Sequence, residues 1–337
     1  MENFNILNIE EIKNLNHEDQ NEFIEQILRG EGKISLLSGA PKSGKSTLAL
    51  NFAKCIASGT PFLGFKTRKS SVLYISLDSE VDTISQKINA LNVQSDLNLY
   101  FITDIYIQLG NDDDLNLNED IPTLLEVLEA ALSKINDLKI VILDMFDNVR
   151  TLTDYNQYSN EKLRLDLDFV KGIAKNLDLH ILLLNHDRKQ GASNAYNISI
   201  GGTKLVGLLN GSFIHLSRAC LGDRVAKIEI GGRNVEEQVI NVYFDSKSCK
   251  FEKIPDEEYE DIDPDIAKVR NFIQIKKEFN GTMSKLCAQV GLSVKATSLG
   301  RKIKNNLELL YSEGIKCEKV SGHTNGRLYR LTLIETD

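Results

Sequence analysis

Gly39-Ala-Pro-Lys-Ser-Gly-Lys-Ser-Thr47 is the most specific pattern in this chain, and the fold can be worked out from it. It fits the pattern G-x-x-x-x-G-K-[ST], a glycine-rich loop whose backbone N–H groups surround the phosphates of a nucleotide. In this pattern the lysine reaches the β- and γ-phosphates, and the serine hydroxyl is a ligand of Mg²⁺. The sequence therefore predicts binding of ATP and Mg²⁺ by one run of residues: Gly39, Ala40, Pro41, Lys42, Ser43, Gly44, Lys45, Ser46 and Thr47.

The segments on either side of this loop have the composition that its function requires. Lys33-Ile-Ser-Leu-Leu-Ser38 is an apolar run of strand length. Ser46 to Ala57 carries apolar residues at helical spacing until Gly59 and Pro61 end the pattern. A strand, the loop and a helix thus follow one another, and the positive end of the helix faces the anion.

Two later strands are expected to end beside the loop, because ligands bind at the carboxyl ends of parallel strands. Lys139-Ile-Val-Ile-Leu-Asp144 ends in a carboxylate that is suited to hold Mg²⁺. Ser71-Val-Leu-Tyr-Ile-Ser-Leu77 is followed by Asp78-Ser-Glu80. Asp78 either orients the water that attacks the γ-phosphate or caps the helix starting near Val81, and for Glu80 we expect the cap.

A third strand, Leu179-His-Ile-Leu-Leu-Leu184, runs into Asn185-His-Asp-Arg-Lys189. A polar side chain at this point would lie near the γ-phosphate and could report its presence. His186 is our candidate, with Asn185 as the next choice, and the alternative is a surface histidine in a loop. The loop 190–202, rich in Gly, Ser, Asn and Ala, could face the central channel of a ring.

The pattern of strands and helices indicates an α/β fold, with a mostly parallel twisted sheet flanked by helices. We expect a polar, helical segment over residues 1–32, whose apolar face would contain Phe23 and Ile24. The ATPase domain would span residues 33–250, and its last strands, near 212–217, 225–230 and 238–244, would join the sheet as antiparallel strands. An acidic linker, 251–263, would precede a basic domain at 264–337.

Charge is distributed unevenly along the chain. The formal net charge is −8, yet residues 264–337 hold thirteen Lys and Arg against seven Asp and Glu, a difference of 13 − 7 = +6. Such asymmetry is typical of an acidic enzyme with a basic nucleic-acid-binding appendage. Three helical stretches, near 266–279, 283–290 and 294–312, and a hairpin around 321–325 predict a winged helix, for contact with DNA or, alternatively, only with proteins.

Other features exclude several classes of protein. No apolar run approaches the roughly 18 residues of a membrane span, and we expect a cytoplasmic protein. The five cysteines lie far apart without metal-ligand spacing, so we expect reduced thiols. No Asn-Lys-x-Asp motif is present to read guanine, which favours ATP over GTP.

On these motifs the chain resembles the RecA-fold ATPases of the RepA type, the AAA ATPase-like replicative helicases of plasmids and phages, over residues ~20 to 250. The resemblance implies a homo-oligomeric ring such as a hexamer, with nucleotide between subunits and a cation crossing from the neighbouring subunit. Relatives usually have Glu where Asp78 stands, and they often have Arg where Ile200 stands. The crossing cation could be Arg218, Lys227 or Arg233, and a Lys-x-x-x-x-x-Arg spacing favours the last two.

Our hypothesis from the sequence is an oligomeric DNA-dependent ATPase of a mobile element or phage, with Lys45, Asp78, Asp144, His186 and Arg233 in catalytic roles. Single-stranded DNA would pass through the ring, and duplex DNA would bind the winged helix. The alternative is an ATP-switched DNA-binding regulator or partition-like factor with slow hydrolysis. A small-molecule kinase is weaker, because nothing in the sequence reads as a lid.

Overall fold

The computed structural model describes residues 8–10, 22–110, 120–149, 160–187, 207–218, 223–233, 235–255, 262–320 and 328–334. The chain divides into two compact units. The first comprises Met1–Leu216, Ile228–Ile240 and Asp245–Glu252, and the second comprises Ser217–Lys227, Asn241–Phe244 and Lys253–Asp337. No helix in these described ranges has both the length and the apolar character needed to cross a membrane.

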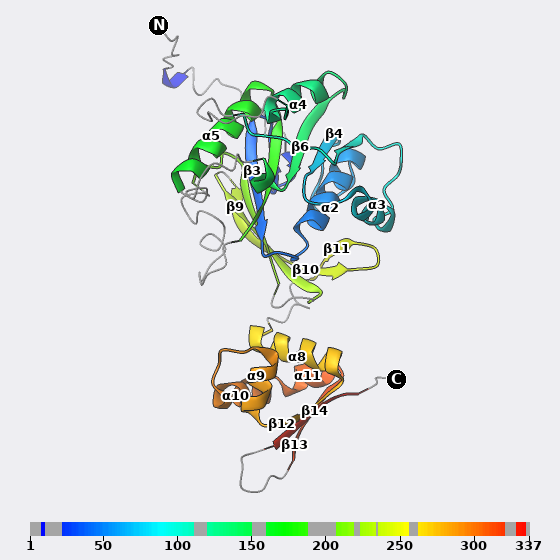
Figure 1. Cartoon of the computed structure of the whole chain (residues 1–337), viewed down its shortest axis with the longest axis vertical. Helices are drawn as coiled ribbons and strands as arrows, with labels where there is room; N and C mark the ends of the chain where they lie inside the picture. The colour runs from blue at the N-terminus through cyan, green and yellow to red at the C-terminus, as the bar shows by residue number, and fades with distance from the viewer. Residues whose placement is uncertain are drawn as a thin grey trace. The chain divides into compact units, whose positions relative to one another are not determined.

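A nine-stranded sheet in the order β11-β10-β9-β8-β3-β7-β6-β4-β5 organises the fold (Figure 1). Six neighbouring strands, from β8 to β5, run parallel. The strand that precedes the phosphate-binding loop, β3, lies inside this parallel group. The strands are β3 (Lys33–Gly39), β4 (Ser71–Ser76), β5 (Leu99–Ile102), β6 (Leu138–Asp144), β7 (His180–His186), β8 (Ser212–Ser217), β9 (Val225–Gly232), β10 (Val235–Asp245) and β11 (Lys250–Lys253).

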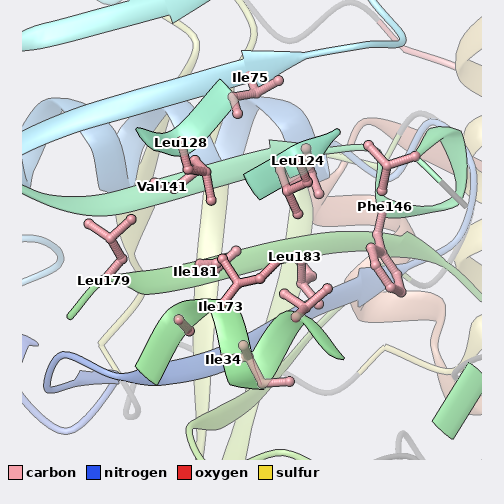
Figure 2. Packing of buried hydrophobic residues seen from close by; sticks show 14 of the residues in the cluster. Ile34, Ile75, Leu124, Leu128, Val141, Phe146, Ile173, Leu179, Ile181 and Leu183 are labelled. Carbon is pink, nitrogen blue, oxygen red and sulfur yellow. The ribbon is translucent and has the colours of Figure 1, made fainter. Parts of the chain in front are cut away.

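Helices cover both faces of the parallel strands. On one face α4 (Leu124–Leu132) and α5 (Asn160–Asn176) pack on alternate strand residues, among them Val141, Ile181 and Leu183, which are fully buried (Figure 2). The residues between them point to the other face, where α2 (Lys45–Ser58) packs on β3, β4 and β6. Burial on both faces explains why these strands read as continuous apolar runs.

The ends of α2 are set by glycines. Gly44 and Gly59 occupy the two cap positions with φ of 105° and 74°, a left-handed conformation that costs glycine little. The helices α3 (Val81–Ala90) and η1 (Phe146–Asn148) follow β4 and β6. Glu80 is the N-cap of α3, as expected by position, but its side chain makes no capping hydrogen bond.

The predicted N-terminal helix is wrong for residues 22–29. These residues form an antiparallel hairpin of β1 (Glu22–Ile24) and β2 (Leu28–Arg29). Its four large apolar side chains have no solvent exposure: Phe23, Ile24, Ile27 and Leu28. The spacing of these residues is also compatible with one face of a helix, which explains the wrong prediction. In the structure Gln26, with a φ of 59°, turns the chain, and tertiary packing buries the four side chains.

The predicted antiparallel direction is wrong for β8, which pairs in parallel with β3 through Leu36↔Phe213 and Gly39↔Leu216. Gly211 permits this close approach, since a Cβ there would lie 2.6 Å from the Ile34 carbonyl oxygen. The neighbouring strands β9 and β10 are joined by a connection too short for a crossover, so this pair is antiparallel.

The C-terminal part of the second unit combines helices with a small antiparallel sheet in the order β12-β14-β13. It has its own apolar core, which includes Ile266, Leu299 and Leu331, all without exposure. The elements are α8 (Pro264–Lys276), β12 (Glu278–Gly281), α9 (Met283–Val290), α10 (Ala296–Asn305), α11 (Leu307–Ser312), β13 (Ile315–Val320) and β14 (Leu328–Leu333).

Two helices of this region differ from the prediction. The helix expected to reach Phe279 ends at Lys276, because Lys277 has a φ of 69° and Phe279 pairs with Leu331 in the sheet. The long helix expected after Ser293 is interrupted at Asn306, which separates α10 from α11. Several predicted segments lie wholly or partly outside the described residues: the loop 190–202, residues 256–261 of the acidic linker and the hairpin tip 321–325.

Candidate nucleotide-binding site

The parallel register brings the predicted site residues to one edge of the sheet. Gly39 at the end of β3 is paired with His186 at the end of β7. Ser76 at the end of β4 is paired with Asp144 at the end of β6. Four strands that are far apart in the sequence thus end together around the start of α2.

The loop between β3 and α2 has the strained backbone of a phosphate-binding loop. Lys42 and Gly44 have φ of 63° and 105°. A Cβ on Gly39 would lie 2.6 Å from the Leu216 carbonyl oxygen and 2.9 Å from Ser43 Oγ, so only glycine fits there. Ser43 Oγ is buried without a hydrogen-bond partner among the described residues, and it is available to a phosphate oxygen.

The remaining loop residues frame this arrangement. Ala40, Pro41 and Lys42 are exposed, and the Ser43 N–H donates to the Ala40 carbonyl at 3.1 Å. Thr47 is buried within the first turn of α2.

Lys45 points its ammonium group into this edge. Its Nζ donates to the carbonyl oxygens of Gly39 and Ala40 at 2.9 and 3.0 Å, and it lies 3.1 Å from His186 Nδ1. Burial lowers the pKa of Lys45. Three carboxylates raise this pKa, with effects that decrease in the order Asp187, Asp144 and Asp78. The Lys45 ammonium group is therefore surrounded by negative charge, and a bound phosphate would add to it.

Asp144 is 1% exposed and is held by Tyr74, whose hydroxyl donates to Oδ2 at 2.7 Å. Burial raises the pKa of the Asp144 carboxyl, while hydrogen bonds with Tyr74 and Ser46 act in the opposite direction. Oδ1 is buried and has no hydrogen-bond partner within the described ranges. An unpartnered carboxylate oxygen next to a serine hydroxyl is a donor set that suits Mg²⁺, which prefers oxygen ligands.

Asp78 lines a cavity of ≈ 380 Å³ just beyond β4, together with Ser76, Glu80 and Tyr106. Its charge raises the pKa of Lys45, of Asp144 and of His186, so all three lie within its electrostatic range. The structure therefore brings Asp78 to the same edge as the other predicted residues.

The side chains of Asn185 and His186 point to opposite faces of β7, as successive strand residues do. His186 lies on the face of Lys45, and burial, followed by the charge of Lys45, lowers its pKa. Asn185 is 1% exposed and accepts a hydrogen bond from the His186 N–H at 2.8 Å. Of the two candidates, His186 is the one that contacts the loop lysine.

The three candidate crossing cations have different surroundings. Arg233 follows β9 and donates from Nη2 to the Gly207 carbonyl at 3.3 Å in an exposed position. Arg218 is engaged within its own unit, by a hydrogen bond to the Asp223 carbonyl and by its position 4.9 Å from the ring centroid of Phe244. Lys227 lies within β9.

Two features of the site were missed by the sequence analysis. Tyr74 lies inside an apolar strand, and only the pairing of β4 with β6 places its hydroxyl against Asp144. Asp187 follows His186 directly. Its place in a run of polar residues after an apolar strand is the sequence feature that could have identified it as a site residue. It contributes the largest favourable charge on Lys45.

The fold and the site define a P-loop NTPase with a RecA-like fold. The chain belongs to the AAA domain family, whose model matches residues 4–192, more than half of the sequence. A comparison with curated proteins finds no match.

Solved structures share the fold at low sequence identity. One is an isolated ATPase domain, with a TM-score of 0.52, 13% identity, and coverage of 67% of this chain and 86% of that one. Another is a DnaB-like replicative helicase studied with its primase interactions, with a TM-score of 0.52, 12% identity and 67% coverage of this chain. Only 58% of that helicase chain is covered.

Proposed function

We propose that this protein hydrolyses ATP to move on or remodel DNA, as a ring-forming motor of the replicative-helicase type from a plasmid, phage or other mobile element. The observation that carries the proposal is the convergence of Lys45, Asp144 and His186 at one edge of a RecA-like sheet. The structural likeness to a DnaB-like replicative helicase and the motifs shared with RepA-type ATPases support the DNA-related part.

In this proposal each residue at the edge has one task. Ser46 and Asp144 would hold Mg²⁺, which neutralises phosphate charge when it is bound. Lys45 leaves the carbonyls of Gly39 and Ala40 to bind the β- and γ-phosphates. Asp78 accepts a hydrogen bond from the attacking water, and the neutral His186 ring senses the terminal phosphate.

Arg233 is our choice for the cation supplied to a neighbouring subunit. Within the described ranges, the hydrogen bond that it donates is a long one, to the Gly207 carbonyl at 3.3 Å, which costs little to release. Arg218 would first have to leave the aromatic ring of Phe244 and the Asp223 carbonyl. We therefore expect Arg233→Ala to abolish stimulated turnover and Arg218→Ala to act mainly on stability.

We further propose that residues 264–337 form a winged helix that contacts duplex DNA. Lys295, Arg301 and Lys304 of the α10 region are exposed. Lys302 differs from them, because it is paired with Asp263 at 2.8 Å and with Asp265. Replacing Arg301 and Lys304 by Ala should weaken duplex binding and reduce the slope of log affinity against log salt by about 1 for each lost phosphate contact. Lys302→Ala serves as the matched control.

The test of the motor is ATP turnover by the wild type and by Lys45→Ala, each with and without single-stranded DNA. A Lys45-dependent rate that rises about tenfold or more on DNA, worth roughly 1.4 kcal/mol of coupling, supports the motor. Lys134→Ala removes a charge from an exposed position just after α4, away from the loop, and should retain the rate. A slow rate indifferent to DNA would instead favour the nucleotide-switched DNA-binding regulator, in which hydrolysis only resets the protein.

A further inference from the structure

Beside the nucleotide site, a buried histidine of β8 lies between two carboxylates. His215 of β8 is 2% exposed, and each of its ring nitrogens faces a carboxylate. Nδ1 lies 2.9 Å from Glu229 Oε2 of β9, and Nε2 lies 3.2 Å from Asp187 Oδ2 at the end of β7. All three residues belong to the first unit.

The geometry fixes the charge of this histidine. Carboxylate oxygens accept hydrogen bonds, so both ring nitrogens must carry protons for both contacts to form. Burial alone would lower the pKa of His215, but hydrogen bonds and charges of Asp187 and Glu229 raise it to about 9. The facing strand β3 adds Ser38, which carries no charge. His215 is therefore an imidazolium at neutral pH.

Asp187 connects this cation to the phosphate-binding loop. Its N–H donates to the Gly39 carbonyl at 3.2 Å, and the same carbonyl accepts from Lys45 Nζ at 2.9 Å. Its carboxylate exerts the largest favourable charge effect on Lys45. Asp187 thus interacts with two cations. One is Lys45, which would bind phosphate, and the other is the imidazolium of His215.

We propose that His215 is a positioning residue for ATP binding, which holds the Asp187 carboxylate on the β8 side of the loop and so prevents it from pairing with Lys45. A carboxylate paired with Lys45 would compete with the phosphates for the same ammonium group. The imidazolium is suited to this task because Glu229 anchors its other nitrogen. This inference rests on the proposed binding of ATP at Lys45.

The proposal predicts a rescue. His215→Gln removes the cation that holds Asp187, and the affinity for ATP with Mg²⁺ should fall by about tenfold, since the released carboxylate then competes with the phosphates for Lys45. Asp187→Asn removes the competitor and should bind within about threefold of the wild type. The double variant should bind as Asp187→Asn does, because no carboxylate is left to capture Lys45.

The affinities are measured by calorimetry on the full chain, with folding of each variant checked by thermal unfolding. A double variant as weak as His215→Gln would show a merely structural role and overturn the proposal, as would normal affinity of His215→Gln. Failure of the wild type to bind ATP would refute the proposed function instead. Should His215→Gln not fold, NMR titration of the wild type decides: the pKa of His215 must rise when ATP binds and draws Lys45 away from Asp187, and an unchanged pKa overturns the idea.

Discussion

The Nδ1 atom of His186 lies 3.1 Å from the ammonium nitrogen of Lys45. Lys45 has only protons to offer, so His186 must accept through an unprotonated Nδ1. The lowered pKa of His186, caused by burial and then by Lys45, agrees with a neutral ring at pH 7. The contact joins β7 to the phosphate-binding loop. A phosphate that binds Lys45 therefore changes the hydrogen bonding of His186.

Replacement of His186 should therefore affect turnover more than binding. We expect His186→Ala to lower the maximal rate of ATP hydrolysis by about 100-fold, as for loss of one positioned polar group in an active site. The Michaelis constant for ATP should change little. His186→Gln, which keeps an acceptor, should recover part of the rate. A Michaelis constant raised as strongly as the rate falls would contradict the assignment.

Gly39 offers a test of the loop's packing. In Gly39→Ala the new methyl would meet the Leu216 carbonyl oxygen at 2.6 Å, so β3 and β8 must separate and ATP binding should be lost. The matched control is Gly172→Ala in α5, where nothing lies within 4 Å of the added Cβ. That change should raise the free energy of unfolding by roughly 0.5–1 kcal/mol. Equal ATP affinity in both variants would show that the loop tolerates the methyl group.

Tyr74→Phe tests the hydrogen bond that holds Asp144. Loss of the hydroxyl removes an interaction that lowers the pKa of Asp144, so that pKa should rise further above its usual value. More of the carboxyl is then protonated at a given pH, and the acid limb of Mg²⁺-dependent turnover moves to higher pH. Tyr100→Phe, at a residue 40% exposed on β5, should leave the pH–rate profile unchanged. An identical acid limb in both variants would refute the role of Tyr74.

His180 predicts loss of stability in acid. Its ring is fully buried, and burial lowers its pKa to about 4, whereas the unfolded chain has the ordinary value near 6.5. Between pH 6.5 and pH 4 this histidine is protonated in the unfolded state but neutral in the folded state. The free energy of unfolding therefore falls by about 1.4 kcal/mol for each pH unit in this range. Urea unfolding at pH 7.5 and pH 5 should show a larger loss for the wild type than for His180→Gln, by roughly 2 kcal/mol. Parallel losses would place the acid sensitivity elsewhere.

The sequence was most informative where local pattern and tertiary structure agree. The loop, its helix and the apolar strands that end in Asp144 and His186 could be predicted, because burial on both faces demands apolar runs and phosphate binding demands glycines. The α9 boundaries, Met283–Val290, were also predicted.

The rest depends on which strands are neighbours. The hydrogen bond from Tyr74 to Asp144 exists because β4 lies beside β6, and the cluster around His215 exists because β8 inserts beside β3 in parallel. Neither neighbour relationship is encoded in a local pattern. The predicted N-terminal helix was wrong for another reason, because a positive φ at Gln26 turns the chain where the apolar spacing alone suggested a helix.

That hairpin also sets a limit on how the protein can be shortened. The buried ring of His180 depends on the end of this hairpin for its hydrogen bonds. Its Nδ1 lies 3.1 Å from the Arg29 carbonyl oxygen and 2.8 Å from the Gly30 carbonyl oxygen. An expression boundary placed at Lys33, where the phosphate-binding strand begins, would remove these partners and uncover the apolar surface that Phe23 and Leu28 now bury. Fragments for crystallisation or NMR should therefore start before Glu22. A later start would expose an apolar patch near the beginning of β7 and favour aggregation.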